Sequence, residues 1–263
     1  MKIKTAIILA VLIAIFSLTL VVFQQEKKLN GEDEQIVGEH EPFEVPDDVV
    51  SGVKTQKQHN YSQRFKELEP SSIMKFTEGV ALAKDRNYKG IISRNLRVPS
   101  IPTVSAPLTE FQFIRNLSCR SDLVVIATTK EKRSYLTEDE AWVFTEYKLE
   151  LNNIFRNSIS LSNINNNTIN IEMSGGDVRF KGYHFRMRDD LYEMLKKNKT
   201  YLLFLKSFPE NDSYTVSDAS GIFQLYGNQF RNTSNLAVPD SLKSIDQSSL
   251  INQVKGIQPF DCD

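Results

Sequence analysis

The sequence is poor in the residues that most catalytic and metal centres require. Only three histidines and two cysteines occur among its 263 residues, and no Cys/His cluster has the spacing of a zinc site. A G-x-S-x-G nucleophile elbow and a glycine-rich phosphate loop are both missing. The acids at 138–140 lack the alternating pattern of a calcium loop. The sequence therefore predicts no metal, no cofactor and no catalytic residue.

The scarcity of histidine and cysteine argues against a nucleophilic hydrolase more strongly than against a hydrolase that uses two carboxylates. A nucleophilic hydrolase needs a base beside its nucleophile. His40 and His59 lie in a linker or a lead-in segment, however, and His184 alternates with arginines on a polar hairpin face. Paired carboxylates need to be close only in space. A cell-envelope hydrolase that uses carboxylates is therefore the alternative to a protein without catalytic activity.

An excess of positive charge is also missing. The chain carries 32 lysines and arginines against 33 acids, for a net charge of −1. The two signs nearly balance between Phe111 and Leu225 as well. Because a nucleic-acid-binding domain usually carries a clustered basic surface, we expect no nucleic-acid partner.

Charge is absent altogether from one run near the N-terminus. The run from Thr5 to Phe23 follows Lys2 and Lys4. As a helix it would be roughly 27 Å long, close to the ~30 Å of a bilayer hydrocarbon core. It is long for the apolar part of a signal peptide, and no Ala-x-Ala cleavage site follows it. Residues 1–23 therefore predict a single-pass transmembrane anchor with a cytoplasmic N-terminus, and secretion after cleavage is the alternative.

Residues 24–60 predict a disordered acidic linker. Between Leu29 and Val53 there are eight acids and no lysine or arginine, and such a segment buries too little apolar surface to fold. A solvated spacer between membrane and domain is the expected role.

Residues 61–109 predict a lead-in to the main domain. Tyr61–Leu68 and Ile73–Lys84 have the pattern of short helices, and Val98–Pro107 contains three prolines, which favour an extended connector.

From about Phe111 the pattern changes to strands. Some runs are continuously apolar, as in strands buried on both faces, and others alternate between apolar and polar residues. The main predicted strands are Leu123–Ala127, 143–152, 168–173, Tyr201–Leu205, Tyr214–Val216 and Ile222–Leu225. Gly175-Gly176 is expected to end the third of them.

The pair Lys181-Gly182 predicts a two-residue hairpin turn. With this turn Phe180 faces Tyr183 and Val178 faces Phe185, so that all four side chains share one face. A register shifted by one residue would destroy that agreement.

One short helix is expected between the strands. Asp190 has Glu193 at capping-box-like spacing, and apolar residues at helical spacing continue to Leu195, with Asn198 as the end. A mainly β fold follows: a small barrel at 110–227 with one inserted short helix, or a sandwich as the alternative architecture. The Ser/Asn-rich residues 228–263 predict a loosely packed C-terminal tail.

Cys119 and Cys262 lie far apart in sequence. In an exported domain they could form a disulfide, and two free thiols are equally compatible with the sequence.

Three segments resemble a group of exported bacterial proteins of unassigned activity. They are SDLVVIA (121–127), SYLTEDEAWVFTEYKLEL (134–151) and KTYLLFLKSFPENDSY (199–214). The most specific part is LTED-x-x-W-V-F-T-E-Y. The resemblance covers about 40% of the chain and implies a bacterial cell membrane location and an extracytoplasmic domain, but it implies no activity.

The order of elements is also remotely similar to the netrin-like, OB-type barrel of tissue inhibitors of metalloproteinases. There too a D-x-V-V-I strand, here Asp122–Ile126, opens the barrel. Those inhibitors bind zinc through an N-terminal cysteine, whereas Cys119 lies deep inside this chain. The resemblance therefore implies an OB/netrin-like barrel without that inhibitory mechanism.

A small basic stripe is the candidate ligand site. It consists of Arg179, Lys181, His184, Arg186 and Arg188 on the polar face of the predicted hairpin. Together the features predict a membrane-anchored, extracytoplasmic binding module without catalytic activity, whose partner is an unknown protein or glycan. An anionic glycan or lipid bound by the stripe is a second alternative.

Overall fold

The computed structural model describes residues 55–68, 75–88, 91–96, 108–158, 167–236, 238–257 and 262. The predicted anchor at 1–23, residues 24–54 of the predicted linker and the connector at Val98–Pro107 lie outside these residues. The prediction of disorder is wrong for residues 56–60 of the linker, because they form the start of the helix Gln56–Leu68. No helix in the described ranges is both long enough and apolar enough to cross a membrane.

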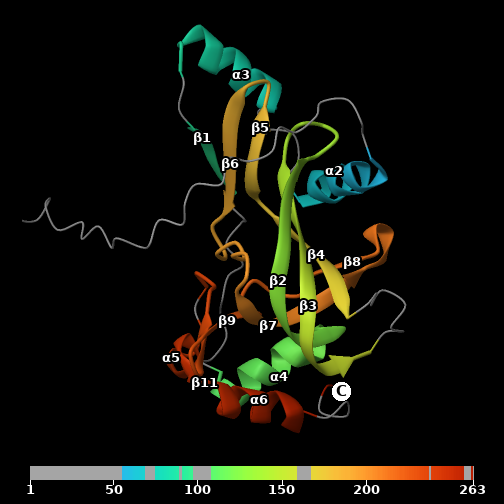
Figure 1. Ribbon diagram of the computed structural model, residues 1–263, viewed down its shortest axis with the longest axis vertical. Helices are drawn as coiled ribbons and strands as arrows, with labels where there is room; N and C mark the ends of the chain where they lie inside the picture. Colours follow the sequence, from blue (N-terminus) through green and yellow to red (C-terminus); the bar gives the residue numbers. More distant parts are fainter. Residues whose placement is uncertain are drawn as a thin grey trace, which may run out of the picture. The chain divides into compact units, whose positions relative to one another are not determined.

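The described part of the chain is mainly β, with eleven strands in two sheets and few helices (Figure 1). The helices are α2 (Gln56–Leu68), α3 (Phe76–Asp85), α4 (Glu110–Arg120), the 3-10 turn η2 (Pro209–Asn211), α5 (Asp240–Lys243) and α6 (Gln247–Gly256). The strands are β1 (Ile91–Leu96), β2 (Leu123–Leu136), β3 (Val143–Asn157), β4 (Thr168–Ser174), β5 (Gly176–Phe180), β6 (Tyr183–Asp189), β7 (Thr200–Phe208), β8 (Ser213–Val216), β9 (Ile222–Tyr226), β10 (Gln229–Asn232) and β11 (Ile245–Asp246).

The larger sheet has the order β11-β10-β9-β7-β2-β3-β4-β8, and β8 also pairs with β7. Strands β2, β3, β4, β8 and β7 are therefore joined in an unbroken circuit of pairings. Within it β4 and β8 run parallel, and the other neighbours run antiparallel.

Alternation along β3 explains how this circuit acquires a core. Tyr147, Leu149 and Leu151 are buried, while Lys148 between them is exposed. Because successive side chains of a strand point to opposite faces, the buried set faces inward. It meets apolar residues of the other four strands in one cluster with Leu195.

The smaller sheet has the order β1-β6-β5. The predicted hairpin is confirmed: Val178 pairs with Phe185 and Phe180 with Tyr183. Lys181 and Gly182 both have positive φ, which a two-residue hairpin turn of type I′ requires. Strand β1, which the sequence analysis did not predict, adds to β6 in parallel.

A second apolar cluster joins this hairpin to the β2–β3 end and to α2 and α3. Helix α3 approaches closely because it has a glycine at the contact. A Cβ on Gly79 would lie 3.3 Å from the ring of Phe185.

A third cluster lies beneath α4, α5 and α6, on strands β2, β7, β9, β10 and β11. Helix α4 begins in a capping box formed by Thr109 and Gln112. Cys119 at its end forms a disulfide with Cys262, with their Cα atoms 5.2 Å apart.

Two predictions about local structure are corrected. The chain near Phe111 forms α4 rather than a strand. No helix forms from Asp190 to Asn198, because these residues make other contacts. Asp189 accepts a hydrogen bond from the Leu191 amide, and Tyr192 pairs with Ser234 in an isolated bridge.

The prediction of a loosely packed tail at 228–263 is also corrected. This region forms β10, α5, β11 and α6, and Phe230, Leu242 and Leu250 are fully buried. The apolar residues are widely spaced among serines and asparagines, but each faces the third cluster. The tail is part of the folded domain.

Candidate functional site

Helix α2 lies on the outer face of strands β3 and β4 (Figure 1). It contacts the β2–β3 turn on one side and η2 on the other. We call the surface beneath it the α2 seat. It comprises residues 136–139, Phe144, Glu146, Glu172 and residues 210–211.

The centre of the α2 seat is a group of charges. The ammonium of Lys57 lies 2.9 Å from Glu146 Oε1 and 3.5 Å from Glu172 Oε1. The Glu172 side chain is completely buried. Its other oxygen, Oε2, accepts a hydrogen bond of 2.9 Å from the Asn211 amide. A single lysine thus meets two carboxylates.

Strand register brings the two acids together. Glu146 on β3 and Glu172 on β4 are direct cross-strand partners. Like charges in this position repel each other, and the ammonium of Lys57 lies within ion-pair distance of both. Arg133 is the partner of Glu146 on the opposite side, and it is exposed.

The charges of the α2 seat alter the titration of Lys57. Burial alone lowers the pKa of its ammonium. The hydrogen bond and charge of Glu146, followed by the charge of Glu172, more than offset this effect and raise the pKa above its ordinary value of 10.5. The ammonium of Lys57 therefore stays charged throughout the neutral range.

An aromatic contact lies next to the charges. The ring of Tyr61 stacks on that of Phe144, with centroids 3.8 Å apart and planes 3° from parallel. Tyr135 stacks on Phe144 at 5.3 Å, and Phe208 meets Tyr61 edge-on at 5.8 Å. Phe144 is an outward residue of β3, yet it is only 1% exposed, because aromatic side chains cover it.

Helix and strand match in spacing at these two contacts. Lys57 and Tyr61 are four residues apart, about 6 Å along a helix axis. Glu146 and Phe144 are two residues apart, about 7 Å along a strand. One helical turn therefore fits two successive outward positions of β3, and α2 runs antiparallel to the strand.

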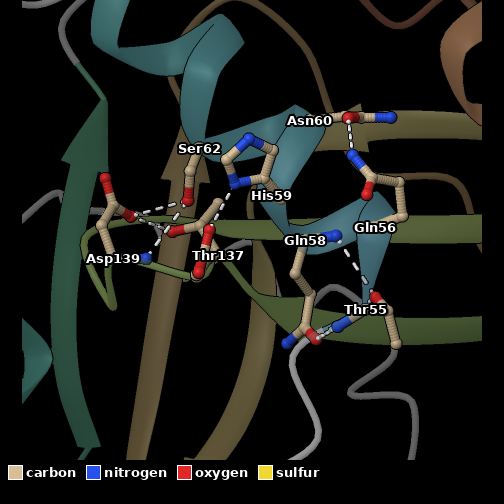
Figure 2. Close-up of polar contacts among 9 residues, drawn as sticks. Thr55, Gln56, Gln58, His59, Asn60, Ser62, Thr137 and Asp139 are labelled. Atoms are coloured by element: carbon tan, nitrogen blue, oxygen red, sulfur yellow. Dashed lines mark hydrogen bonds and ion pairs between the residues drawn. The ribbon is translucent and has the colours of Figure 1, made fainter.

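The β2–β3 turn holds one side of α2 (Figure 2). The hydroxyl of Ser62 lies 3.2 Å from Asp139 Oδ1, and His59 Nδ1 lies 2.6 Å from Glu138 Oε2. Thr137 shapes the turn, since its hydroxyl donates to Asp139 and accepts from the Trp142 amide. The residues of the LTED sequence therefore either shape the turn or contact α2.

The β7–β8 connection holds the other side. The amide of Asn60 donates to Asn211 Oδ1 at 2.8 Å and to the Glu210 carbonyl at 3.0 Å. Asn211 in turn donates to Glu172, which links this connection to the charged centre. On the opposite side Gln58 donates to the Leu136 carbonyl.

The predicted basic stripe lies on the β5–β6 hairpin. Its members are Arg179, Lys181, His184, Arg186 and Arg188. An acid, Asp177, lies among them, and its contacts were not predicted from the sequence. Asp177 Oδ1 accepts from Arg186 Nε at 2.7 Å and lies 3.1 Å from His184 Nε2. Part of the stripe is thus neutralised within the hairpin, and Lys181 lies over the ring of Phe180.

One further polar group has the residue types of a catalytic site. Ser174 Oγ lies 2.6 Å from both Asp189 Oδ2 and the Tyr192 hydroxyl. Burial, followed by the charge of Asp189, raises the pKa of Tyr192 far above its ordinary value. A phenol that stays protonated is not a base, so Tyr192 does not serve as one for Ser174. The hydrogen bonds of this group link the end of β4 to the chain after β6.

Metal binding finds no support in the residues that the structure describes, where no group of three or more His, Cys, Asp or Glu residues could hold an ion. Two acids do converge, at Glu146 and Glu172, but a lysine fills the space between them. The polar residues that alternate along β3 and β4 are the only sequence pattern that indicates this site. That pattern does not predict that Glu172 is buried.

Comparison with known proteins adds no assignment: no protein-family model and no curated protein matches the chain.

Proposed function

We propose that this chain is a membrane-anchored, extracytoplasmic binding module built on an OB/netrin-like barrel, without catalytic activity. Residues 1–23 are its anchor and hold it at a bacterial cell membrane. The partner is a protein or a glycan on the outer side of that membrane.

The closed circuit of strand pairings supports the barrel. An OB barrel has five strands in a Greek-key arrangement, and the circuit consists of five strands, β2, β3, β4, β7 and β8 in chain order. The resemblance to exported proteins rests largely on the β2–β3 region. That region supplies most of the α2 seat.

The disulfide between Cys119 and Cys262 supports the extracytoplasmic location. Disulfides persist in oxidising compartments, and reducing systems keep cytosolic thiols free. A bridge that closes a loop of 143 residues would be lost from a cytosolic domain together with its stabilising effect.

The position of the α2 seat is the observation that carries the binding function. In OB barrels the ligand face consists of the second and third strands with the loops after the first and the fourth. Here these are β3, β4, the β2–β3 turn and η2, which are the elements that α2 contacts. The face that binds ligands in such barrels carries α2 of the same chain here, and this correspondence supports the proposed binding role.

The same observation argues against a carboxylate hydrolase. A retaining or inverting pair needs one acid protonated and a substrate between the two. Glu146 and Glu172 instead share the ammonium of Lys57, and α2 covers them. Among the described residues, these two acids therefore converge on a lysine of the same chain and not around a space for a substrate.

A topology experiment tests the proposal. The full chain is expressed in a bacterial host, and spheroplasts are treated with protease before and after lysis. We expect the domain to be digested in intact spheroplasts and to stay in the membrane pellet after an alkaline carbonate wash. Protection in intact spheroplasts would contradict the proposed location, and release of a shortened chain into the medium would indicate cleavage in place of anchoring.

Catalysis is tested separately. The purified full chain is incubated with isolated cell-wall polymer, alongside the Glu146→Gln and Glu172→Gln variants. We expect no release of soluble fragments by any of the three. Release by the unmodified chain alone would show that the acids act as a hydrolytic pair.

A further inference from the structure

We infer that the smaller sheet binds a linear polyanion, a glycan-like envelope polymer in which phosphodiesters join short polyol units. The surface that binds it is the polar face of β5, β6 and β1, which we call the basic face. The inference rests on the proposed binding function and names the chemistry of the partner.

Strand register defines the two faces of this sheet. The buried face belongs to the second apolar cluster, through residues such as Val178 and Phe185. Because successive side chains of a strand point to opposite faces, residues 177, 179, 184, 186 and 188 share the other face. Strand β1 pairs with β6 in parallel and contains no acidic residue.

The basic face carries an excess of positive charge. Its charged or titratable members are Asp177, Arg179, His184, Arg186 and Arg188. With the histidine neutral, three arginines and one aspartate give this face a net charge of +2. The pairing of Asp177 with Arg186 is already included in that sum, so the face attracts an anionic partner.

Basic residues are also close neighbours on this face. Arg179 is the cross-strand partner of His184. Arg186 and Arg188 are two residues apart on β6, which is about 7 Å along a strand. Like charges at neighbouring positions destabilise a sheet. A row of anions bound along β6 offsets this repulsion.

The spacing of the arginines indicates the kind of anion. A chain that pairs with successive outward residues of β6 needs one anion roughly every 7 Å, and phosphodiesters between short polyol units meet this need. A guanidinium also presents its donors as a planar fork that matches two oxygens of a phosphate.

The aromatic residues of the hairpin argue against nucleic acid as the polyanion. Phe180, Tyr183 and Phe185 lie in the second apolar cluster or pack against it, on the opposite face of the sheet. Proteins that bind single-stranded nucleic acid usually stack the bases on such rings. Because the basic face offers none of these three rings, a polymer without bases fits it better.

The experiment measures the binding of fluorescently labelled poly(glycerol phosphate) to the full chain, purified in detergent, by fluorescence anisotropy. In an Arg179→Ser, Arg188→Ser double variant we expect the dissociation constant to rise at least tenfold. Its salt dependence should become shallower, because contacts between cations and phosphates are lost. Asp177→Asn removes the acid from the basic face and should lower the dissociation constant at least threefold.

A matched double variant, Lys130→Ser with Lys148→Ser, removes the same amount of charge from another surface. These lysines are exposed on β2 and β3 and pair with Glu150 and Glu131. This variant should bind the polymer as the unmodified chain does. Arg188 is exposed, so Arg188→Ser alone, with an expected threefold rise, carries the test if the arginine double variant does not fold.

Three results would overturn the inference. They are no binding of the polymer by the unmodified chain, an equal loss of binding in the lysine variant, and tighter binding of single-stranded DNA of matched length. The second result would mean that only the overall charge matters, and the third that bases are recognised. Because binding in micelles is independent of membrane topology, failure here is separable from failure of the proposed location.

Discussion

The two sets of helices that pack on the larger sheet are held in different ways. Helices α4 and α6 pack on the sheet through apolar residues, with Ile114 and Leu250 fully buried. They are also joined by a hydrogen bond between Gln253 and Glu110, and the disulfide ties α4 to the C-terminal residues. Helix α2 contacts the strands through the ring of Tyr61, which stacks on Phe144 and meets Phe208 edge-on, and through polar side chains such as those of Lys57 and Asn60.

This difference separates a structural contact from a recognition contact. Apolar burial contributes roughly 25 cal/mol per Å² and is not directional, so the α4–α6 layer stabilises the fold. Charge pairs and hydrogen bonds contribute less net free energy but specify geometry. The polar contacts of the α2 seat therefore specify how α2 is placed on β3 and β4.

Removal of the disulfide should have the largest effect. A Cys119→Ser, Cys262→Ser double variant loses a bridge across 143 residues, which chain-entropy theory values at about 5 kcal/mol. We expect the free energy of unfolding to fall by an amount near this figure, measured by denaturant titration. An unchanged midpoint would show that the bridge adds nothing to the α4–α6 layer.

Truncation of a buried residue in the α4–α6 layer should cause the second-largest loss in the free energy of unfolding. Leu250 is fully buried on α6, and Leu→Ala in a core costs about 2–5 kcal/mol. Leu250→Ala should lower the free energy of unfolding by that amount, with Ser249→Ala on the exposed face as control. A loss below about 1 kcal/mol would mean that α6 resembles α2 in its attachment.

Truncation on α2 should give a smaller global effect. In Tyr61→Ala the stacking on Phe144 is lost. We expect this loss to reduce the free energy of α2 docking more than the free energy of global unfolding. We expect a change of less than about 1 kcal/mol in global unfolding, since the strands stay folded when α2 opens. A global loss near 3 kcal/mol, as typical for a buried aromatic residue, would contradict the proposed separation.

The pH dependence of α2 docking should be the smallest effect. The pKa of Lys57 is raised by its contacts with Glu146 and Glu172, although burial opposes this. Its contribution is therefore fully present below the unfolded value of about 10.5 and is lost as the pH rises through the higher folded value. An NMR titration of labelled lysine should show Lys57 titrating above 10.5, and titration below that value would contradict the ion pair.

Local patterns in the sequence predicted local structure well. The β5–β6 hairpin follows from Lys181-Gly182 and four apolar residues, which fix turn and register within eight residues. The strands around Leu123 and Tyr201 follow from apolar runs. The helix expected after Asp190 does not form, because Tyr192 and Leu195 contact residues distant in sequence.

The candidate site was less predictable for the same reason. Nothing adjacent in sequence indicates that Glu172 is buried, or that Lys57, 115 residues earlier, pairs with it. The alternation of basic residues predicted the stripe, but it did not predict the ion pair of Arg186 with Asp177. The pairing of Lys57 with Glu172 depends on the docking of α2, and that of Asp177 with Arg186 depends on the cross-strand register of β5 and β6.

Native-state hydrogen exchange tests the central claim most directly. If α2 is attached less firmly than the strands on which it packs, its backbone amides should exchange at least a hundredfold faster than those of β2 and β3. If α2 instead exchanges as slowly as those strands, it opens only when the domain unfolds, and the α2 seat is a structural contact rather than a binding site.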